Sequence, residues 1–184
     1  MLALNQPPGR GRRFAFMHWP NYRAADWNAV VRAVTPALPA TPVLIMGSDR
    51  DEGAIEAARA NARRAGVAEH VTLQCRPISA IEPPALPGWV VTNPPYGLRT
   101  GPPGRRPERG PRGRSPLRGL YAALGDVLRA RCPNWSVALL CPDEELIRAT
   151  GLAFDPARAL HTLNGGLRVT LWQARTPPAP APGR

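Results

Sequence analysis

One short stretch of the sequence fixes both the end of a strand and the loop that follows it. Val90 and Val91 are apolar and β-branched, as in a buried strand, and they lead into Asn-Pro-Pro-Tyr-Gly at residues 93–97. Two consecutive prolines remove two backbone donors, so this sequence can continue neither a helix nor a sheet ladder. We therefore predict a buried strand that ends with these valines and a loop over residues 93–97.

Strand and helix patterns alternate along the rest of the chain. We predict helices over residues 25–37, 51–66, 116–131 and 142–151, and strands over residues 42–49, 70–75, 88–93 and 134–141. Residues 158–166 and 167–175 are predicted to close the fold as a hairpin around Gly165 and Gly166. This alternation indicates an α/β sheet of mainly parallel strands, and ligands bind such sheets beyond the carboxyl ends of the strands.

The net charge points to a polyanionic partner. The 184 residues are one domain's worth, and 24 Lys plus Arg against 13 Asp plus Glu give +11. Arginine forks pair with phosphates, so an excess of this size favours nucleic acid. A coding bias toward Arg, Ala, Pro and Gly is the alternative source of the excess.

Several other classes of protein are excluded by what the sequence lacks. No apolar run approaches the ~20 residues that a membrane span needs, and the first residues show no apolar h-region, so we expect no leader peptide. We expect a soluble, cytoplasmic protein with reduced cysteines and no metal site, because no ligand spacing connects Cys75, Cys132, Cys141, His18, His70 and His161.

The loop at residues 93–97 carries the chemistry that the rest of the sequence lacks. The Pro94 carbonyl has no competing donor on either proline, and the Asn93 side chain adds an amide oxygen beside it. Tyr96 supplies an aromatic face. Two acceptors and a stacking ring suit a planar ring that bears an exocyclic amine.

Asn-Pro-Pro-Tyr after an apolar strand resembles the catalytic motif of class I S-adenosylmethionine-dependent amino-methyltransferases. More widely, "GRRFAFMHWPNY", "VTNPPYG", "LYAALGD" and "LNGGLRV" are similar, in order and spacing, to the bacterial enzymes that methylate the N2 amine of a guanine in 23S ribosomal RNA, and to their tRNA relatives. The resemblance covers nearly all of residues 1–175. It implies a Rossmann-like sheet, S-adenosyl-L-methionine as cofactor, an RNA partner and a catalytic set of Asn93, Pro94, Pro95 and Tyr96.

A second segment, "GSDRDEGAIEAARANARRAGV", resembles the family's second-strand motif, in which an acid accepts hydrogen bonds from the cofactor's ribose. Asp49 is the better match and Asp51 is the reserve, while Asn93 also belongs to the implied cofactor site. From its position alone, Asp51 could serve only as the N-cap of the following helix.

The chain departs from the family in two places. The family's Gly-rich first motif should lie upstream of Leu2, so we expect this chain to be truncated and to lack the first, central strand together with the usual N-terminal RNA-binding module. Pro77 stands where the family usually has an acid that contacts the adenine ring, and a proline side chain accepts no hydrogen bond.

The predicted organisation is a catalytic domain over residues 1–175, a mobile basic loop over residues 98–116 and a disordered tail over residues 176–184. Candidate RNA-binding residues are Arg10, Arg12, Arg13 and Arg99. For Arg10, Arg12 and Arg13 the alternative to RNA phosphate contacts is a solvated basic turn, and for the arginines of residues 99–118 a neutral insertion explains them equally well. Trp19 and Trp27 are expected to serve packing rather than base stacking.

The sequence thus predicts a methyltransferase that acts on a guanine N2 in 23S ribosomal RNA. A non-catalytic, truncated RNA-binding remnant is the main alternative. A tRNA guanine, an adenine N6 and a protein glutamine are further candidate substrates, because the loop chemistry fits each of them.

Overall fold

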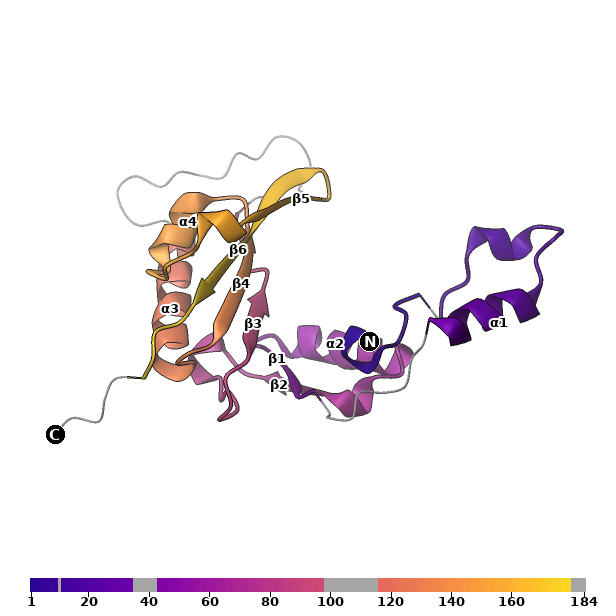
Figure 1. Ribbon diagram of the computed structural model, residues 1–184. Helices are drawn as coiled ribbons and strands as arrows, with labels where there is room; N and C mark the ends of the chain where they lie inside the picture. The colour runs from indigo at the N-terminus through magenta and orange to yellow at the C-terminus, as the bar shows by residue number, and fades with distance from the viewer. Residues whose placement is uncertain (10, 35–42, 98–115, 180–184) are drawn as a thin grey trace. The chain divides into compact units, whose positions relative to one another are not determined.

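The computed structural model describes residues 1–9, 11–34, 43–97 and 116–179. Contacts divide the chain into two compact units, Met1–Pro77 and Ile78–Arg184, and Figure 1 shows the elements of both. The predicted RNA-binding residues Arg10 and Arg99 and most of the predicted basic loop lie outside the described residues.

The first unit contains α1 (Ala24–Ala33), β1 (Ile45–Asp49), α2 (Glu52–Arg64) and β2 (Val71–Cys75), with 3-10 turns at Leu2–Leu4, Ala15–His18 and Ala68–His70. β1 and β2 form a parallel two-stranded sheet in which Asp49 lies opposite Cys75. The side chain of Asp51 caps α2, and Gly66, at φ +66°, follows its end. Ile55 of α2 is buried, so the helix packs through one side.

The second unit contains β3 (Trp89–Thr92), α3 (Pro116–Arg131), β4 (Ser136–Cys141), α4 (Glu144–Ala149), β5 (Leu160–Asn164) and β6 (Leu167–Arg175), with 3-10 turns at Ile78–Ala80 and Pro156–Arg158. The strand order is β3-β4-β6-β5. The β5–β6 hairpin turns at Gly165 and Gly166, which have φ of 58° and 83°, as the sequence predicted.

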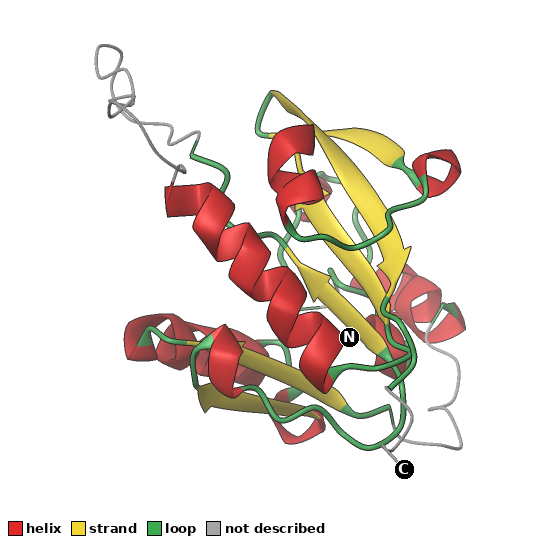
Figure 2. Ribbon diagram, turned by 90° about the vertical axis from the view of Figure 1, so that its left-hand side faces the viewer, coloured by secondary structure: helices red, strands yellow, loops and turns green. Residues whose placement is uncertain are grey.

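The largest core of the described chain lies in this second unit. Figure 2 shows α3 along one face of the four-stranded sheet. Tyr121, Leu124 and Leu128 of α3 are buried against Val137 and Leu139 of β4, as the helical spacing predicted. Leu120, which the sequence placed on the same side, is exposed.

The α/β class with a closing antiparallel hairpin is confirmed: β1–β2 and β3–β4 are parallel, and β5–β6 is the predicted antiparallel hairpin. β4 and β6 also pair antiparallel, so parallel pairs are half of those described, fewer than predicted. The expectation that the strand before the loop is buried is wrong, since Val91 is 71% exposed. Among the described residues β1 pairs only with β2, and β3 only with β4, so each of these strands lies at a sheet edge.

The chain remains ordered beyond the point where the sequence predicted a tail. Thr176 is 2% exposed, and its hydroxyl donates to the Cys132 carbonyl. The backbone N–H of Asn134 donates to the Pro177 carbonyl at 3.1 Å. These contacts fasten the end of β6 to the turn between α3 and β4. Nowhere in the described ranges is a helix both long and apolar enough to cross a membrane.

Candidate functional site

The loop that follows β3 lies at the carboxyl end of a strand, as predicted. Thr92 is the last residue of β3 and pairs with Leu139 of the parallel strand β4, so both strands end at the same edge of the sheet. Tyr96 is half-buried and packs against the core. At Gly97, with φ +79°, an added Cβ would lie 2.9 Å from Leu117 Cδ1, so this position requires glycine.

The two predicted acceptors of the loop make no hydrogen bond to the part of the chain that the structure describes. Asn93 is exposed, and neither its side-chain amide nor the Pro94 carbonyl has a hydrogen-bond partner among the described residues. Pro94 is half-buried and Pro95 is exposed. The two oxygens are therefore left to solvent or to a ligand, and an amide oxygen and a backbone carbonyl are both acceptors that an amine can use.

A cavity of about 540 Å³ opens beside the loop, and its size is in the range of small-molecule sites. It is lined by Tyr96, Pro142, Asp143, Glu144, Glu145 and Arg148. Apart from Tyr96, all of these residues come from the end of β4 and the start of α4. The sequence predicted only a helix over residues 142–151 here, and the parallel pairing of β3 with β4 is what brings this segment to the loop.

The carboxylates of this cavity have different partners. The Asp143 carboxylate caps α4, accepting from the backbone N–H of Glu145 at 2.8 Å and of Leu146 at 3.3 Å. Glu144 pairs with Arg148 at 2.6 Å. The carboxylate of Glu145 has no hydrogen-bond or ion-pair partner within the described part of the chain, so it is available to a ligand.

A buried tyrosine supports the strand end beneath the cavity. The Tyr121 hydroxyl donates to Cys141 Sγ at 3.3 Å, and the Asp143 backbone N–H donates to the same sulfur at 3.4 Å. Burial raises the pKa of the Tyr121 hydroxyl far above its usual range, so the group stays neutral at all physiological pH values. Tyr121 is therefore a support for the start of α4 rather than an acid or a base.

The predicted cofactor residues lie in the first unit, at the carboxyl end of β1. Asp49 is the last residue of the strand, and its exposed carboxylate accepts the Asp51 backbone N–H at 3.0 Å. The Asp51 carboxylate accepts from the backbone N–H of Gly53 at 2.8 Å and of Ala54 at 3.4 Å. The N-cap alternative therefore describes Asp51, whereas Asp49 keeps a carboxylate oxygen that no described residue occupies.

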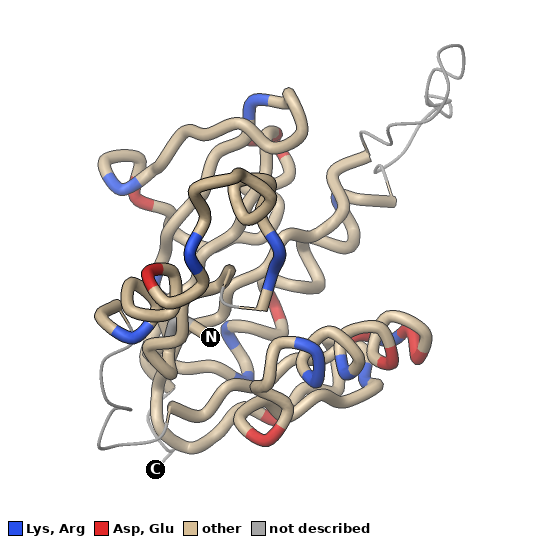
Figure 3. Tube along the Cα trace, turned by 90° about the vertical axis from the view of Figure 1, so that its right-hand side faces the viewer, with Lys and Arg blue, Asp and Glu red and all other residues tan. Residues whose placement is uncertain are grey.

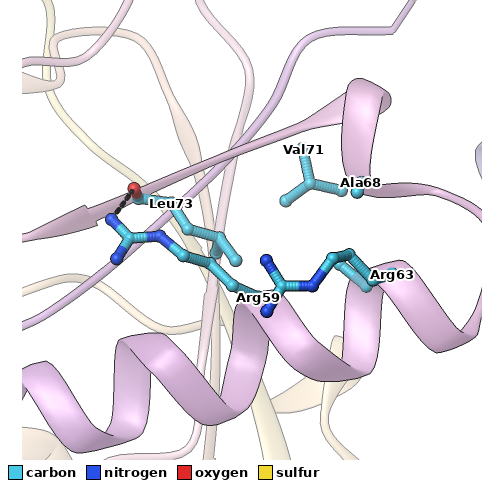
Figure 4. Close-up of a pocket in the computed structure, with 6 residues that line it drawn as sticks. Arg59, Arg63, Ala68, Val71 and Leu73 are labelled. Carbon is cyan, nitrogen blue, oxygen red and sulfur yellow. Dashed lines mark hydrogen bonds between the residues drawn. The ribbon is translucent and has the colours of Figure 1, made fainter.

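The first unit also holds a basic cavity of about 270 Å³ between α2 and β2 (Figure 4). Arg59 donates to the Leu73 carbonyl at 3.2 Å and pairs with Glu52 at 3.2 Å. Arg63 lies one helical turn further along the same helix. The bonds of Arg59 fasten α2 to β2, so this cavity is part of the packing of the unit.

The remaining predicted residues are exposed. Arg12 and Arg13 lie on the surface, and the Arg12 guanidinium is 5.9 Å from the centre of the Phe14 ring. Across the described ranges, no group of three or more His, Cys, Asp or Glu side chains could hold a metal ion.

Comparison with known proteins identifies relatives over almost the whole chain. The family model described as the RMKL-like methyltransferase domain matches residues 1–173. A curated relative from Shewanella oneidensis, the ribosomal RNA large subunit methyltransferase K/L, is 34% identical over 172 residues, which are 91% of this chain and 22% of the relative. The chain thus spans about a fifth of the length of the curated relatives that it matches.

Solved structures agree with this family at the level of the fold. The structure of SMU.472, described as a methyltransferase complexed with SAH, has a TM-score of 0.76 and 26% identity, covering 99% of this chain and 44% of that one. A Listeria monocytogenes protein described as a predicted N6-adenine-specific DNA methylase has a TM-score of 0.71 and 27% identity. The match covers 96% of this chain and 42% of the Listeria chain.

Proposed function

Because this chain belongs to the RMKL-like methyltransferase domain family, we propose that it transfers a methyl group from S-adenosylmethionine to the N2 amine of a guanine in large-subunit ribosomal RNA. The observation that carries the proposal is the loop after β3, in which the acceptors of Asn93 and Pro94, which no described residue engages, precede the half-buried ring of Tyr96. A ribosomal RNA substrate would place the activity in the cytoplasm.

In the proposed mechanism the protein holds and activates the amine. The Asn93 amide oxygen and the Pro94 carbonyl accept hydrogen bonds from the two N–H groups of the amine, which raises the electron density on its nitrogen. Tyr96 stacks on the base and fixes the direction of the nitrogen lone pair. As the new C–N bond forms, the bond between the methyl carbon and the sulfonium sulfur of the cofactor would break, its electron pair staying on the sulfur, and the amine would lose one proton to solvent. The base must leave its stack to reach such a pocket.

The residues of the first unit fit the proposed cofactor. When bound, S-adenosylmethionine supplies a methyl group made electrophilic by its sulfonium. The unoccupied carboxylate oxygen of Asp49, at the carboxyl end of β1, is suited to accept the ribose hydroxyls. Pro77 offers no side-chain acceptor after β2, so Asp49 should account for much of the polar recognition of the cofactor.

Replacing Asp49 with Asn should weaken binding of S-adenosylhomocysteine roughly ten- to hundredfold, because hydrogen bonds to a charged acceptor are lost. Calorimetric titration measures this affinity. Asp51→Asn is the matched control, since asparagine caps helices as well as aspartate does and the cofactor affinity should not change. Equal affinities for Asp49→Asn and the unmodified protein would remove Asp49 from the site.

One carboxylate of the cavity beside Tyr96 supports guanine over adenine as the proposed substrate. In guanine the ring atom next to the N2 amine carries a proton, N1–H, whereas in adenine the N1 next to the N6 amine has a lone pair. A carboxylate near the amine site therefore accepts a hydrogen bond from guanine and repels adenine. Glu145 is the carboxylate of this cavity that has no partner within the described chain. Adenine is the second candidate, because the loop chemistry suits it and the Listeria relative is described as an adenine methylase.

Replacing Glu145 with Gln should reduce the rate of methyl transfer to guanine. The ratio of the guanine rate to the adenine rate should fall about tenfold, because the glutamine amide can donate a hydrogen bond to the N1 lone pair of adenine. The measurement uses two matched RNA oligonucleotides that differ only at the target base, with methylated nucleosides identified by mass spectrometry. Glu144→Gln is the control, since Glu144 already pairs with Arg148.

The same assay tests the proposed function as a whole. With unmodified large-subunit ribosomal RNA as substrate, the expected product is N2-methylguanosine. N6-methyladenosine as the product would replace the guanine proposal with the adenine one. If the chain neither binds S-adenosylhomocysteine nor methylates RNA, the non-catalytic remnant becomes the better account.

A further inference from the structure

We propose that an aromatic cluster in the first unit is a base-stacking platform for single-stranded RNA, with Trp19 as its outer face. The cluster consists of Phe14, Phe16, Trp19, Tyr22 and Trp27. The inference rests on the proposed function only in taking RNA as the partner. It adds a binding surface in the first unit. This surface contains none of the residues of the loop at 93–97.

The inner rings of the cluster are fixed by one another. Phe14 and Phe16 stack at 5.6 Å with their planes 10° apart, and Trp27 of α1 contacts them at 5.6 Å and 5.4 Å. All three are half-buried. Trp27 therefore serves packing, as the sequence predicted. Because the inner rings are already fixed in the folded protein, binding a ligand would cost little further side-chain entropy.

Trp19 has a different environment from Trp27. It is 62% exposed, and among the described aromatic residues its ring pairs with that of Phe16, at 6.3 Å and 67°. Tryptophan is costly to expose, and an indole held at its edge by a neighbouring ring leaves aromatic surface open to a ligand. The packing role predicted from the sequence does not describe this residue.

The charge around the cluster selects a nucleic acid over an apolar partner. No acidic residue occurs before Asp26, and Asp26 is paired with Arg23 at 2.7 Å. Arg12 and Arg13 are exposed without an ion-pair partner in the described segments, and Arg12 lies above the Phe14 ring. Basic positions occur in both units (Figure 3), but here they flank exposed aromatic surface. Aromatic rings that stack bases, interleaved with arginines that contact phosphates, are how proteins bind single strands.

The test measures binding of a fluorescent single-stranded RNA by anisotropy across a range of salt concentrations. Trp19→Leu should weaken binding about five- to hundredfold, because leucine keeps the apolar volume but offers no ring to stack. Trp19→Phe should restore most of the affinity. Neither change should alter the salt slope, whereas Arg13→Gln should lower that slope by about 1.

Two controls make the result specific. Leu86→Ala removes another exposed apolar side chain, at 81% exposure in the second unit, and should not change RNA binding. A duplex of the same sequence should bind each Trp19 variant equally, since its bases are already stacked. Circular dichroism reports whether each variant is folded, and the Trp19→Phe variant keeps the test decisive if Trp19→Leu unfolds.

The outcomes separate this inference from the proposed function. If Trp19→Leu and Trp19→Phe bind RNA as the unmodified protein does, the platform is wrong and the cluster is a packing surface for another protein segment. If RNA binding depends on Trp19 while no methyl transfer occurs, the platform stands and the proposed function fails. If both variants bind RNA as the unmodified protein does and still transfer methyl groups, the platform is wrong and the proposed function stands.

Discussion

Asn93→Ala is expected to slow methyl transfer by about 10²- to 10³-fold, the loss typical when one preorganised hydrogen-bonding group at a reacting atom is removed. The variant deletes one of the two acceptors that are proposed to hold the amine. The fold should not change, because Asn93 is exposed and its side chain has no partner among the described residues. Single-turnover transfer of a labelled methyl group to RNA, with enzyme in excess, measures the chemical step.

Two companion variants separate the acceptor from the rest of the loop. Asn93→Asp keeps an acceptor oxygen at the same place and should retain more activity than Asn93→Ala. Tyr96→Phe keeps the ring that stacks on the base and should retain most of the rate. A full single-turnover rate for Asn93→Ala would show that the amine is held elsewhere, and the role of the loop would have to be withdrawn.

The elements of this fold could be predicted from local signals. Proline at 116 and the apolar spacing that follows gave the bounds of α3, and the Asp51 cap with Gly66 bracketed α2. These are short-range effects, because a cap or a positive φ depends on neighbours within a few residues. The turn at Gly165 and Gly166 has the same local origin.

The exposure of the strands could not be predicted in the same way. Val90 and Val91 have the composition of a buried strand, yet Val91 is largely exposed. Burial depends on which segment covers a strand, and no periodicity within the strand carries that information. For the same reason the sequence could not distinguish Trp19 from Trp27, because the two differ in their ring contacts and not in their sequence pattern.

The sequence indicated the loop of the candidate site but not the cavity residue Glu145, for a related reason. The loop at residues 93–97 carries its own chemistry, so its role could be inferred from residue types. Glu145 reaches the cavity only because β4 pairs in parallel with β3, which is a long-range arrangement. The acidic run Pro-Asp-Glu-Glu directly after the strand that ends at Cys141 is the signal that could have indicated it.

Gly125→Ala is expected to destabilise the protein by about 3 kcal/mol, at the upper end of the usual cost of overpacking. An added Cβ would lie 1.8 Å from the Thr150 carbonyl oxygen and 2.8 Å from its Cα. These are backbone atoms at the end of α4, and they cannot rotate away as a side chain would. Thr150 is fully buried and its carbonyl also accepts from Arg129 at 2.6 Å, so α3 and α4 would have to separate.

Gly119→Ala is the matched control in the same helix. Gly119 is exposed, and an added Cβ would meet nothing within 4 Å, so alanine should stabilise the protein by roughly 0.5–1 kcal/mol through its higher helix propensity. Urea unfolding followed by circular dichroism measures both changes. Because α4 carries Glu145 and Arg148 into the cavity, Gly125→Ala should also disturb the site. Equal stability of the two variants would mean that α3 and α4 do not pack as closely as Gly125 requires.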